Sequence, residues 1–353
     1  MSIKPPFTEL EIKKAPHGFY AGYSLPIALI SKVAMTMLVI WALVWPLNAT
    51  NVLSSLNWTL LEGFNTFYIL AVGVFAFFLF AVAIIPASGR RRMGRPGEKP
   101  EFSNFSWFSM MFGAGLGVGL MVYATAEPMG LWGSNPVIVA GAVEGSSEAA
   151  VQSAFRYTFL HYGFHAWAIY VVTAIAMAYF AYTRDMPLTL RTALTPILGR
   201  FSSGTAGHAI DILGVVATIL GIAVTIGYGI SQLADGAFII TDAAWMIEPA
   251  GSEEGATDKP SLNILLLGLL LVMGLSTISA VSGVGKGIKY LSNLNLVLSL
   301  ILLLTFIVFG SFAFAMTTYG SAMVDYIAHF IPLSFEAYGP QTKAAFVAAL
   351  PAE

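Results

Sequence analysis

The chain consists of long apolar runs separated by short polar loops. A helix that crosses the hydrocarbon core of a bilayer needs about 20 predominantly apolar residues. Seven runs reach that length, and those at 64–86 and 292–316, for example, contain no charged residue at all. We therefore predict seven transmembrane helices, over residues 26–46, 64–86, 107–132, 155–181, 209–233, 263–282 and 292–316.

The composition supports an all-α integral membrane protein whose solvent is the lipid bilayer. Hydrophobic residues make up 57% of the chain and charged residues 10%, against roughly 25% charged residues in soluble domains. The net charge of −2 provides no basic surface for nucleic acid. The absence of cysteine excludes disulfides, thiolate nucleophiles and cysteine-based metal sites. The first apolar run has no small-residue cleavage site, so it is interpreted as a membrane span and not as a signal peptide.

Basic residues concentrate in alternate loops and predict the orientation. Lys259 and Lys343 are the basic residues of the opposite loops, which are otherwise acidic. Cytoplasmic loops carry the excess of lysine and arginine, so the N-terminus is predicted to be cytoplasmic in the plasma (inner) membrane. The basic set is Lys4, Lys13, Lys14, Arg90, Arg91, Arg92, Arg95, Lys99, Arg184, Arg191, Arg200, Lys286 and Lys289.

The third predicted span carries glycine at every second position: Gly113, Gly115, Gly117 and Gly119. Small residues four apart let helices approach closely, which is the packing interpretation. A packing seam needs one such pair, however, and each glycine costs about 1 kcal/mol relative to alanine in a helix. The alternation therefore favours an unwound segment in the membrane. Its carbonyl groups would bind Na⁺, and its free N–H groups would attract a carboxylate.

The fourth predicted span carries an aromatic face. On one continuous helix, Tyr162, Trp167 and Tyr170 fall within an arc of roughly 140°. Electron-rich ring faces around a cavity attract a methylated cation, although tyrosine and tryptophan are also common at the membrane interface. His161 and His165 lie four residues apart and make a poor metal site without a third ligand. Hydrogen bonds to neighbouring helices, or a position facing a polar cavity, are favoured for them over a proton relay.

Three stretches in order resemble the betaine/carnitine/choline transporter family. The first is Lys99-Pro-Glu-Phe-Ser-Asn-Phe-Ser-Trp107 with the glycine-rich run after it and Ala126-Glu-Pro128. The second is the run His-Tyr-Gly-Phe-His-Ala-Trp-Ala-Ile-Tyr at 161–170, and the third runs from Ser282 to Asn295. The resemblance implies two peripheral helices followed by two inverted five-helix repeats, twelve spans in all, as in sodium-coupled amino-acid transporters.

On this resemblance the chain is the first half of a twelve-span, inverted-repeat transporter fold. Residues 1–24 form a cytoplasmic N-terminal segment, and 25–100 form two peripheral helices with a basic cytoplasmic loop. Residues 101–317 form the first repeat. Residues 318–353 form an extracellular or periplasmic interfacial segment, with a short helix over 317–330, that leads to a second repeat. Because no second repeat follows within 353 residues, we expect the chain to be incomplete.

The resemblance also implies a binding site. Trp167 and Tyr170 match the aromatic cage for the substrate, and Tyr162 stands where tryptophan is more usual. Backbone atoms of Gly115, Gly117 and Gly119 belong to the same substrate site. The carbonyl groups of Gly113 and Leu116 match sodium ligands. Thr218 matches one hydroxyl of a second sodium site, in which Ile222 replaces the other.

The expected function is secondary active transport of betaine, choline, carnitine or related quaternary ammonium or sulfonium osmolytes by Na⁺ symport. Na⁺ is the coupling ion, no other cofactor is implied, and the family implies a homotrimer. One alternative is a proton-coupled or exchange carrier of the same family. Another is a membrane subunit that binds the solute without moving it, or a truncated inactive product. No His-Glu-x-x-His motif, Ser/Lys pair or Asp pair lies within a span, so an enzyme is not expected.

Overall fold

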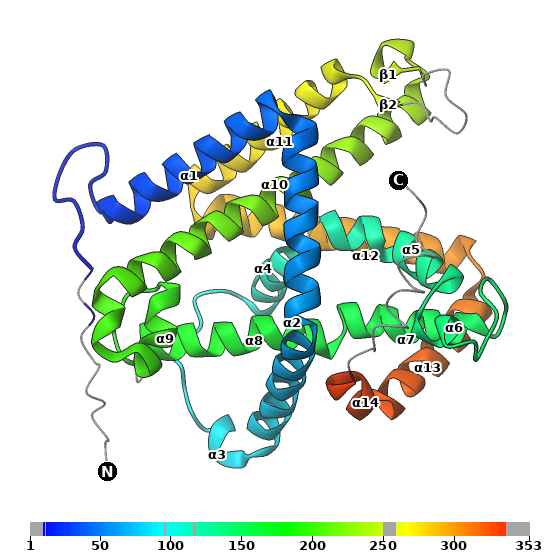
Figure 1. The fold of residues 1–353 in the computed structure, drawn as a ribbon, viewed down its shortest axis with the longest axis horizontal. Helices are drawn as coiled ribbons and strands as arrows, with labels where there is room; N and C mark the ends of the chain where they lie inside the picture. Colours follow the sequence, from blue (N-terminus) through cyan, green and yellow to red (C-terminus); the bar gives the residue numbers. More distant parts are fainter. Residues whose placement is uncertain (1–9, 11, 95–96, 116–117, 250–258, 337–353) are drawn as a thin grey trace. The chain divides into compact units, whose positions relative to one another are not determined.

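In the computed structural model the chain is almost entirely helical (Figure 1). The structure describes residues 10, 12–94, 97–115, 118–249 and 259–336. The chain divides into two compact units. The first contains residues 1–98, 131–219 and 321–353, and the second contains residues 99–130 and 220–320. α5, α10 and α13 pass from one unit to the other.

The first unit is built around α2, which packs against α1, α8 and α14. α7 and α8 follow each other directly, and a π-helical turn at Tyr179–Thr183 ends α8. A 3₁₀ turn, Gly199–Ser203, joins α9 to α10. The helices are α1 (Leu25–Val44), α2 (Pro46–Ile84), α3 (Pro86–Gly89), α6 (Pro136–Val139), α7 (Ala150–Tyr162), α8 (Phe164–Ala178), α9 (Leu190–Leu198), the first part of α10 (Thr205–Thr241), the last part of α13 (Phe312–Ala328), and α14 (Phe330–Phe335).

The second unit is organised by α4 and α12, which pack against each other. A π-helical turn at Val284–Ile288 connects α11 to α12. Two short antiparallel strands pair Ile247 with Pro260 and Glu248 with Lys259. The elements are α4 (Asn104–Gly115), α5 (Val118–Gly133), the second part of α10, a 3₁₀ turn (Ala244–Met246), β1 (Ile247–Glu248), β2 (Lys259–Pro260), α11 (Leu262–Ser282), α12 (Lys289–Phe309) and the first part of α13.

The described residues contain six helical segments long and apolar enough to cross a bilayer. They correspond to six of the seven predicted spans. The predicted third span falls on α4 and α5, and Leu116 and Gly117 between them lie outside the described residues. The last span ends at Phe309 rather than near 316, and α13 replaces the short helix predicted over 317–330. Span two starts earlier than predicted, because Pro46 begins a helix of 39 residues.

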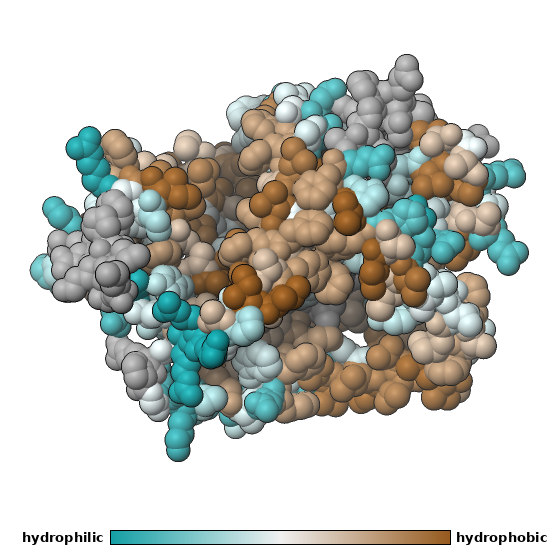
Figure 2. Space-filling model, turned by 90° about the horizontal axis from the view of Figure 1, so that it is seen from below, coloured by the Kyte–Doolittle hydropathy of each residue, from teal (hydrophilic) through white to brown (hydrophobic). Residues whose placement is uncertain are grey.

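Apolar side chains cover the outside of these helices. Leu270 of α11, Phe306 of α12 and Leu43 of α1 are among many large apolar residues that are exposed. Figure 2 shows apolar residues as broad brown areas on the visible face. Soluble monomers rarely expose contiguous apolar patches larger than a few hundred Å². Such a surface is stable when lipid covers it, which agrees with an integral membrane protein.

A buried ion pair fixes the corner between α9 and α10 in the first unit. Arg191 Nε donates to Asp211 Oδ2 at 2.6 Å, and the backbone N–H of Arg191 donates to Asp211 Oδ1 at 3.1 Å. The two side chains are only 1% and 7% exposed. Both charges are almost entirely buried, so each depends on the other for its counter-charge.

Removing one partner of this pair should destabilise the protein. Asp211→Asn leaves the Arg191 guanidinium buried without its counter-charge, which costs about 3–5 kcal/mol for pairs of this kind. A lower midpoint of thermal unfolding in detergent is therefore expected. Asp235→Asn, at an exposed position of the same helix, is the matched control and should leave the midpoint unchanged. Equal midpoints for the two variants would contradict the assignment.

Candidate functional site

Two aromatic side chains stand together on α8. The rings of Trp167 and Tyr170 lie 5.8 Å apart between centroids and are inclined at 46° to each other. Trp167 is 39% exposed and Tyr170 is 67% exposed, so neither ring is fully buried by packing inside the first unit. The three-residue spacing places both rings on one side of the helix, as the sequence predicted. Two inclined, accessible ring faces are a suitable surface for a methylated cation.

Tyr162 is not on the same helix as this pair. α7 ends at Tyr162 and α8 begins at Phe164, so the chain is interrupted at Gly163. The predicted arc of three aromatic residues assumed one continuous helix, and the interruption removes that assumption. The Tyr162 ring stacks on His161, with centroids 4.5 Å apart.

The interruption requires glycine at position 163. Its backbone adopts φ −94° and ψ −146°, which is not helical, while its N–H still donates to the carbonyl oxygen of Phe159 at 2.7 Å. A Cβ added at Gly163 would lie 2.3 Å from that same oxygen. Because the obstacle is backbone, it cannot move aside as a flexible side chain would.

His165 lies two residues before Trp167 on α8. It is a buried residue with a hydrogen-bonded side chain. It is 4% exposed. Its Nδ1 lies 2.7 Å from the Tyr326 hydroxyl and its Nε2 lies 2.8 Å from Ser334 Oγ. The sequence interpretation that this histidine bonds to a neighbouring helix is confirmed.

The glycine-rich segment belongs to the second unit. Gly113 of α4 faces α12, where a Cβ on it would lie 3.5 Å from Ser292 Oγ and 3.7 Å from Asn295 Nδ2. On the same helix pair, the Asn293 amide donates to Ser106 Oγ at 3.3 Å. Polar side chains therefore line α12 where α4 packs on it.

The remaining glycine predictions concern the two helix ends beside this contact. α4 ends at Gly115 and α5 begins at Val118, with Gly119 as its second residue. Leu116 and Gly117 lie outside the described residues. The unwound segment therefore stays a prediction.

Thr218 lies on α10 in the first unit. Its hydroxyl donates to the carbonyl oxygen of Gly214 at 2.7 Å, which leaves the oxygen lone pairs free to accept or to bind a cation. With Ile27 and Asp211 it lines a cavity of about 510 Å³. Ile222, one turn further, is exposed and has no ligand atom.

The structure thus brings Trp167 and Tyr170 together on α8. The aromatic residues and Thr218 belong to the first unit, and the glycines to the second.

The match to a known family decides the class of protein. The sequence model described as the betaine/carnitine/choline family transporter matches residues 26–350. The chain belongs to the betaine/carnitine/choline transporter family. This membership and the six helices long and apolar enough to cross a bilayer among the described residues indicate a multi-pass membrane protein.

Curated relatives of this transporter family agree. The chain is 35% identical to the glycine betaine transporter OpuD of Bacillus subtilis (strain 168), over 84% of this chain and 54% of that protein. It is 35% identical to a probable glycine betaine transporter of Desulfitobacterium hafniense (strain Y51), over 87% and 58% respectively. It is 32% identical to glycine betaine transporter 1 of Vibrio parahaemolyticus, over 81% and 51%. The chain spans about half the length of these relatives.

The sequence analysis did not predict the ion pair between Arg156 and Asp325, which lies near α8. Arg156 of α7 makes a two-pronged ion pair with Asp325 of α13, with Nε–Oδ2 at 2.5 Å and Nη2–Oδ1 at 2.8 Å. The signal was present, because a charged residue inside an apolar span is expected to have a partner. The partner could not be named from the pattern, since it lies 169 residues away.

The interruption can be tested by one methyl group. Gly163→Ala places a Cβ against the Phe159 carbonyl, so the break must distort and the midpoint of thermal unfolding should fall. Gly274→Ala in α11 is the control, because a Cβ there meets nothing within 4 Å. It should be neutral or stabilising by roughly 0.5–1 kcal/mol, since alanine favours a helix more than glycine. A midpoint that is unchanged in Gly163→Ala would contradict the close contact.

Proposed function

We propose that this transporter carries glycine betaine or a closely related quaternary ammonium or sulfonium osmolyte by Na⁺ symport and alternating access. The observation that carries the proposal is the accessible Trp167–Tyr170 pair on a helix of a betaine/carnitine/choline family transporter. The names of the three relatives, each a known or probable glycine betaine transporter, favour that solute over choline or carnitine.

The chemistry of the solute suits this pair. A trimethylammonium group has no N–H to donate, so it cannot be held by hydrogen bonds at the cation. Aromatic faces attract it electrostatically without requiring a donor. The proposal assigns the Trp167 and Tyr170 rings to the cation and gives Tyr162 a place at the edge of the site. The solute carboxylate is assigned to backbone N–H groups of Gly115, Gly117 and Gly119.

Sodium is assigned to backbone carbonyl groups of Gly113 and Leu116. Carbonyl oxygen is a hard ligand that an unwound helix can offer without a charged side chain. Thr218 is proposed as a hydroxyl ligand of a second sodium ion. Na⁺ and solute raise each other's affinity when both favour the same conformation of the carrier.

The proposal extends to the setting of the protein. The alternation of basic and acidic loops supports a cytoplasmic N-terminus in the plasma membrane. A homotrimer is proposed from membership of the family.

Removing the tryptophan ring should weaken solute binding. Cation–π contacts contribute about 0.5–2 kcal/mol, so Trp167→Ala should raise the Kd for glycine betaine about tenfold. The measurement is isothermal titration of the protein expressed from its complete gene, purified and reconstituted. Trp58→Ala, at a similarly exposed tryptophan of α2, is the control and should bind normally. Normal affinity in Trp167→Ala would remove the ring from the site.

The coupling ion can be tested by ion replacement. Proteoliposomes should accumulate radiolabelled glycine betaine under an inward Na⁺ gradient and not when K⁺ replaces Na⁺. A pH gradient alone should not drive uptake, and uptake under that condition would establish the proton-coupled alternative.

The second sodium site has its own test. Thr218→Val removes the hydroxyl and should raise the Na⁺ concentration that supports half-maximal uptake by about tenfold. This change corresponds to a loss of roughly 1.4 kcal/mol in the free energy of Na⁺ binding. Thr225→Val removes a hydroxyl that is likewise bonded to its own helix, and is expected to leave the Na⁺ requirement unchanged. If both variants behave alike, Thr218 is not a ligand.

A further inference from the structure

Two consecutive residues of α13 contact both sides of the interruption at Gly163. Asp325 binds Arg156, which lies on α7 before the break, and Tyr326 binds His165, which lies on α8 after it. Consecutive helix positions point about 100° apart, so one turn of one helix can reach two different helices. All these residues belong to the first unit.

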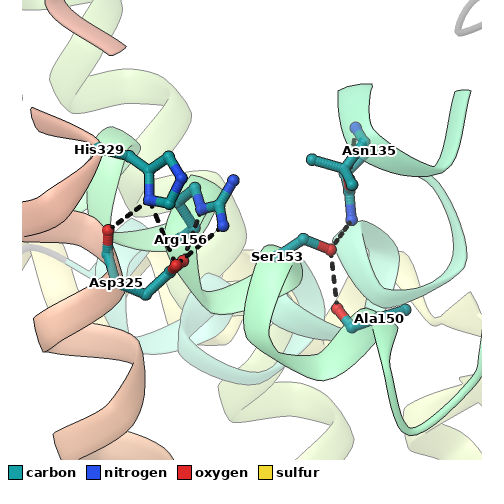
Figure 3. Close-up of polar contacts among 7 residues, drawn as sticks. Asn135, Ala150, Ser153, Arg156, Asp325 and His329 are labelled. Atoms are coloured by element: carbon teal, nitrogen blue, oxygen red, sulfur yellow. Dashed lines mark hydrogen bonds and ion pairs between the residues drawn. The ribbon is translucent and has the colours of Figure 1, made fainter. Parts of the chain in front are cut away.

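The contact with α7 is a partly buried ion pair, shown in Figure 3. Arg156 presents two nitrogens to the two oxygens of Asp325, which fixes direction as well as distance. His329, one turn along, adds its Nδ1 at 3.2 Å from Asp325 Oδ1. From the other side, Asn135 donates to Ser153 Oγ of α7 at 2.9 Å. α7 is therefore anchored at two levels.

The contact with α8 is a chain of hydrogen bonds. The Tyr326 hydroxyl lies 2.7 Å from His165 Nδ1 and donates its proton to that nitrogen when the neutral imidazole carries its own proton on Nε2. The His165 Nε2–H donates to Ser334 Oγ, and Ser334 donates to the Phe330 carbonyl at 2.6 Å. Every group in this chain is satisfied by a neutral histidine.

α14, which follows α13 directly, is itself held against α2. The Phe77 ring stacks on Phe335 with centroids 5.4 Å apart and meets Phe330 edge-on. Gly73 of α2 approaches the Ser334 backbone so closely that a Cβ would lie 2.3 Å from its carbonyl oxygen. The two contacts across Gly163 therefore come from a body that is fixed to a third helix.

We propose that α13 and α14 clamp the break at Gly163 and thereby set the angle between α7 and α8. Arg156 and His165 are positioning residues, because their side chains bind α13 and α14. They act by placing Trp167 and Tyr170, which lie two and five residues beyond His165. This inference rests on the proposed function only where solute binding is the measurement. The angle itself is measured independently.

A charge swap tests the first contact. Arg156→Asp and Asp325→Arg each abolish the ion pair, and the double variant restores it in reverse. Spin labels at Gln152→Cys on α7 and Ala174→Cys on α8 report the angle, since both positions are exposed and this chain has no cysteine of its own. The sample is the protein expressed from its complete gene, in nanodiscs. Each single variant should broaden or shift the distance distribution and weaken glycine betaine binding about tenfold.

The double variant should return both measurements to within about threefold of the parent. Arg200→Asp is the control, because its guanidinium lies over the Phe201 ring and outside the clamp. A residue that merely stabilised the fold would lower the unfolding midpoint without moving the label distance. If either single variant acted through a different contact, the double variant would not restore the label distance and the glycine betaine binding.

Tyr326→Phe tests the second contact. It removes only the hydroxyl, keeps the ring among its aromatic neighbours, and should shift the label distance in the same direction as loss of the ion pair. Tyr182→Phe, at an exposed tyrosine, should leave the distance unchanged. Unchanged distances in both the charge variants and Tyr326→Phe would overturn the clamp. If the parent protein binds no glycine betaine, the proposed function fails, and the label distances still decide the clamp.

Discussion

Within the hydrocarbon of a bilayer, every backbone N–H and C=O must find its partner in the protein, because no water is available there. This constraint explains why all the long apolar segments are helices. It also explains the one interruption that is fully described. At Gly163 the chain gives up helical bonds, and Tyr326 of α13 reaches the first turn of α8 there, with its hydroxyl 2.7 Å from His165 Nδ1.

The same solvent changes what holds helices together. Lipid tails are as apolar as leucine, so burial of apolar surface does not drive one helix onto another in the membrane. Directional polar contacts therefore contribute more to fixing the orientation of the helices relative to one another within the first unit. In the first unit they occur as Arg191 with Asp211, Arg156 with Asp325, and His165 with Tyr326 and Ser334. Each joins helices that are distant in sequence or turn a corner.

Much of the architecture could be predicted because the relevant signals are local. Twenty apolar residues in a row suffice to predict a span, and a spacing of three residues suffices to place Trp167 beside Tyr170. The interruption at Gly163 was not predicted, because a single glycine inside an apolar run is usually tolerated in a helix. The interruption is associated with a close approach of Gly163 to the Phe159 carbonyl and with the contact between Tyr326 and His165. Neither contact can be inferred from the sequence pattern. For the same reason the arc through Tyr162 loses its basis in one continuous helix and stays a prediction.

The polar partners were the least predictable part. Arg156 lies inside an apolar run and therefore predicts an acidic partner. The sequence contains many acidic residues, and no pattern selects Asp325 among them. His165 shows the same limit, since two partners on α13 and α14 lie more than 160 residues away. Pairings of this kind depend on the tertiary arrangement alone.

A continuous helix would have placed the aromatic pair without help, since its geometry fixes every side chain relative to the next. The break at Gly163 introduces an angle that the backbone by itself leaves undetermined. Asp325 and Tyr326 restrain that angle from adjacent positions of one helix, so the two contacts move as a single body. Neither side of the break can change its direction without straining the other contact or displacing α13.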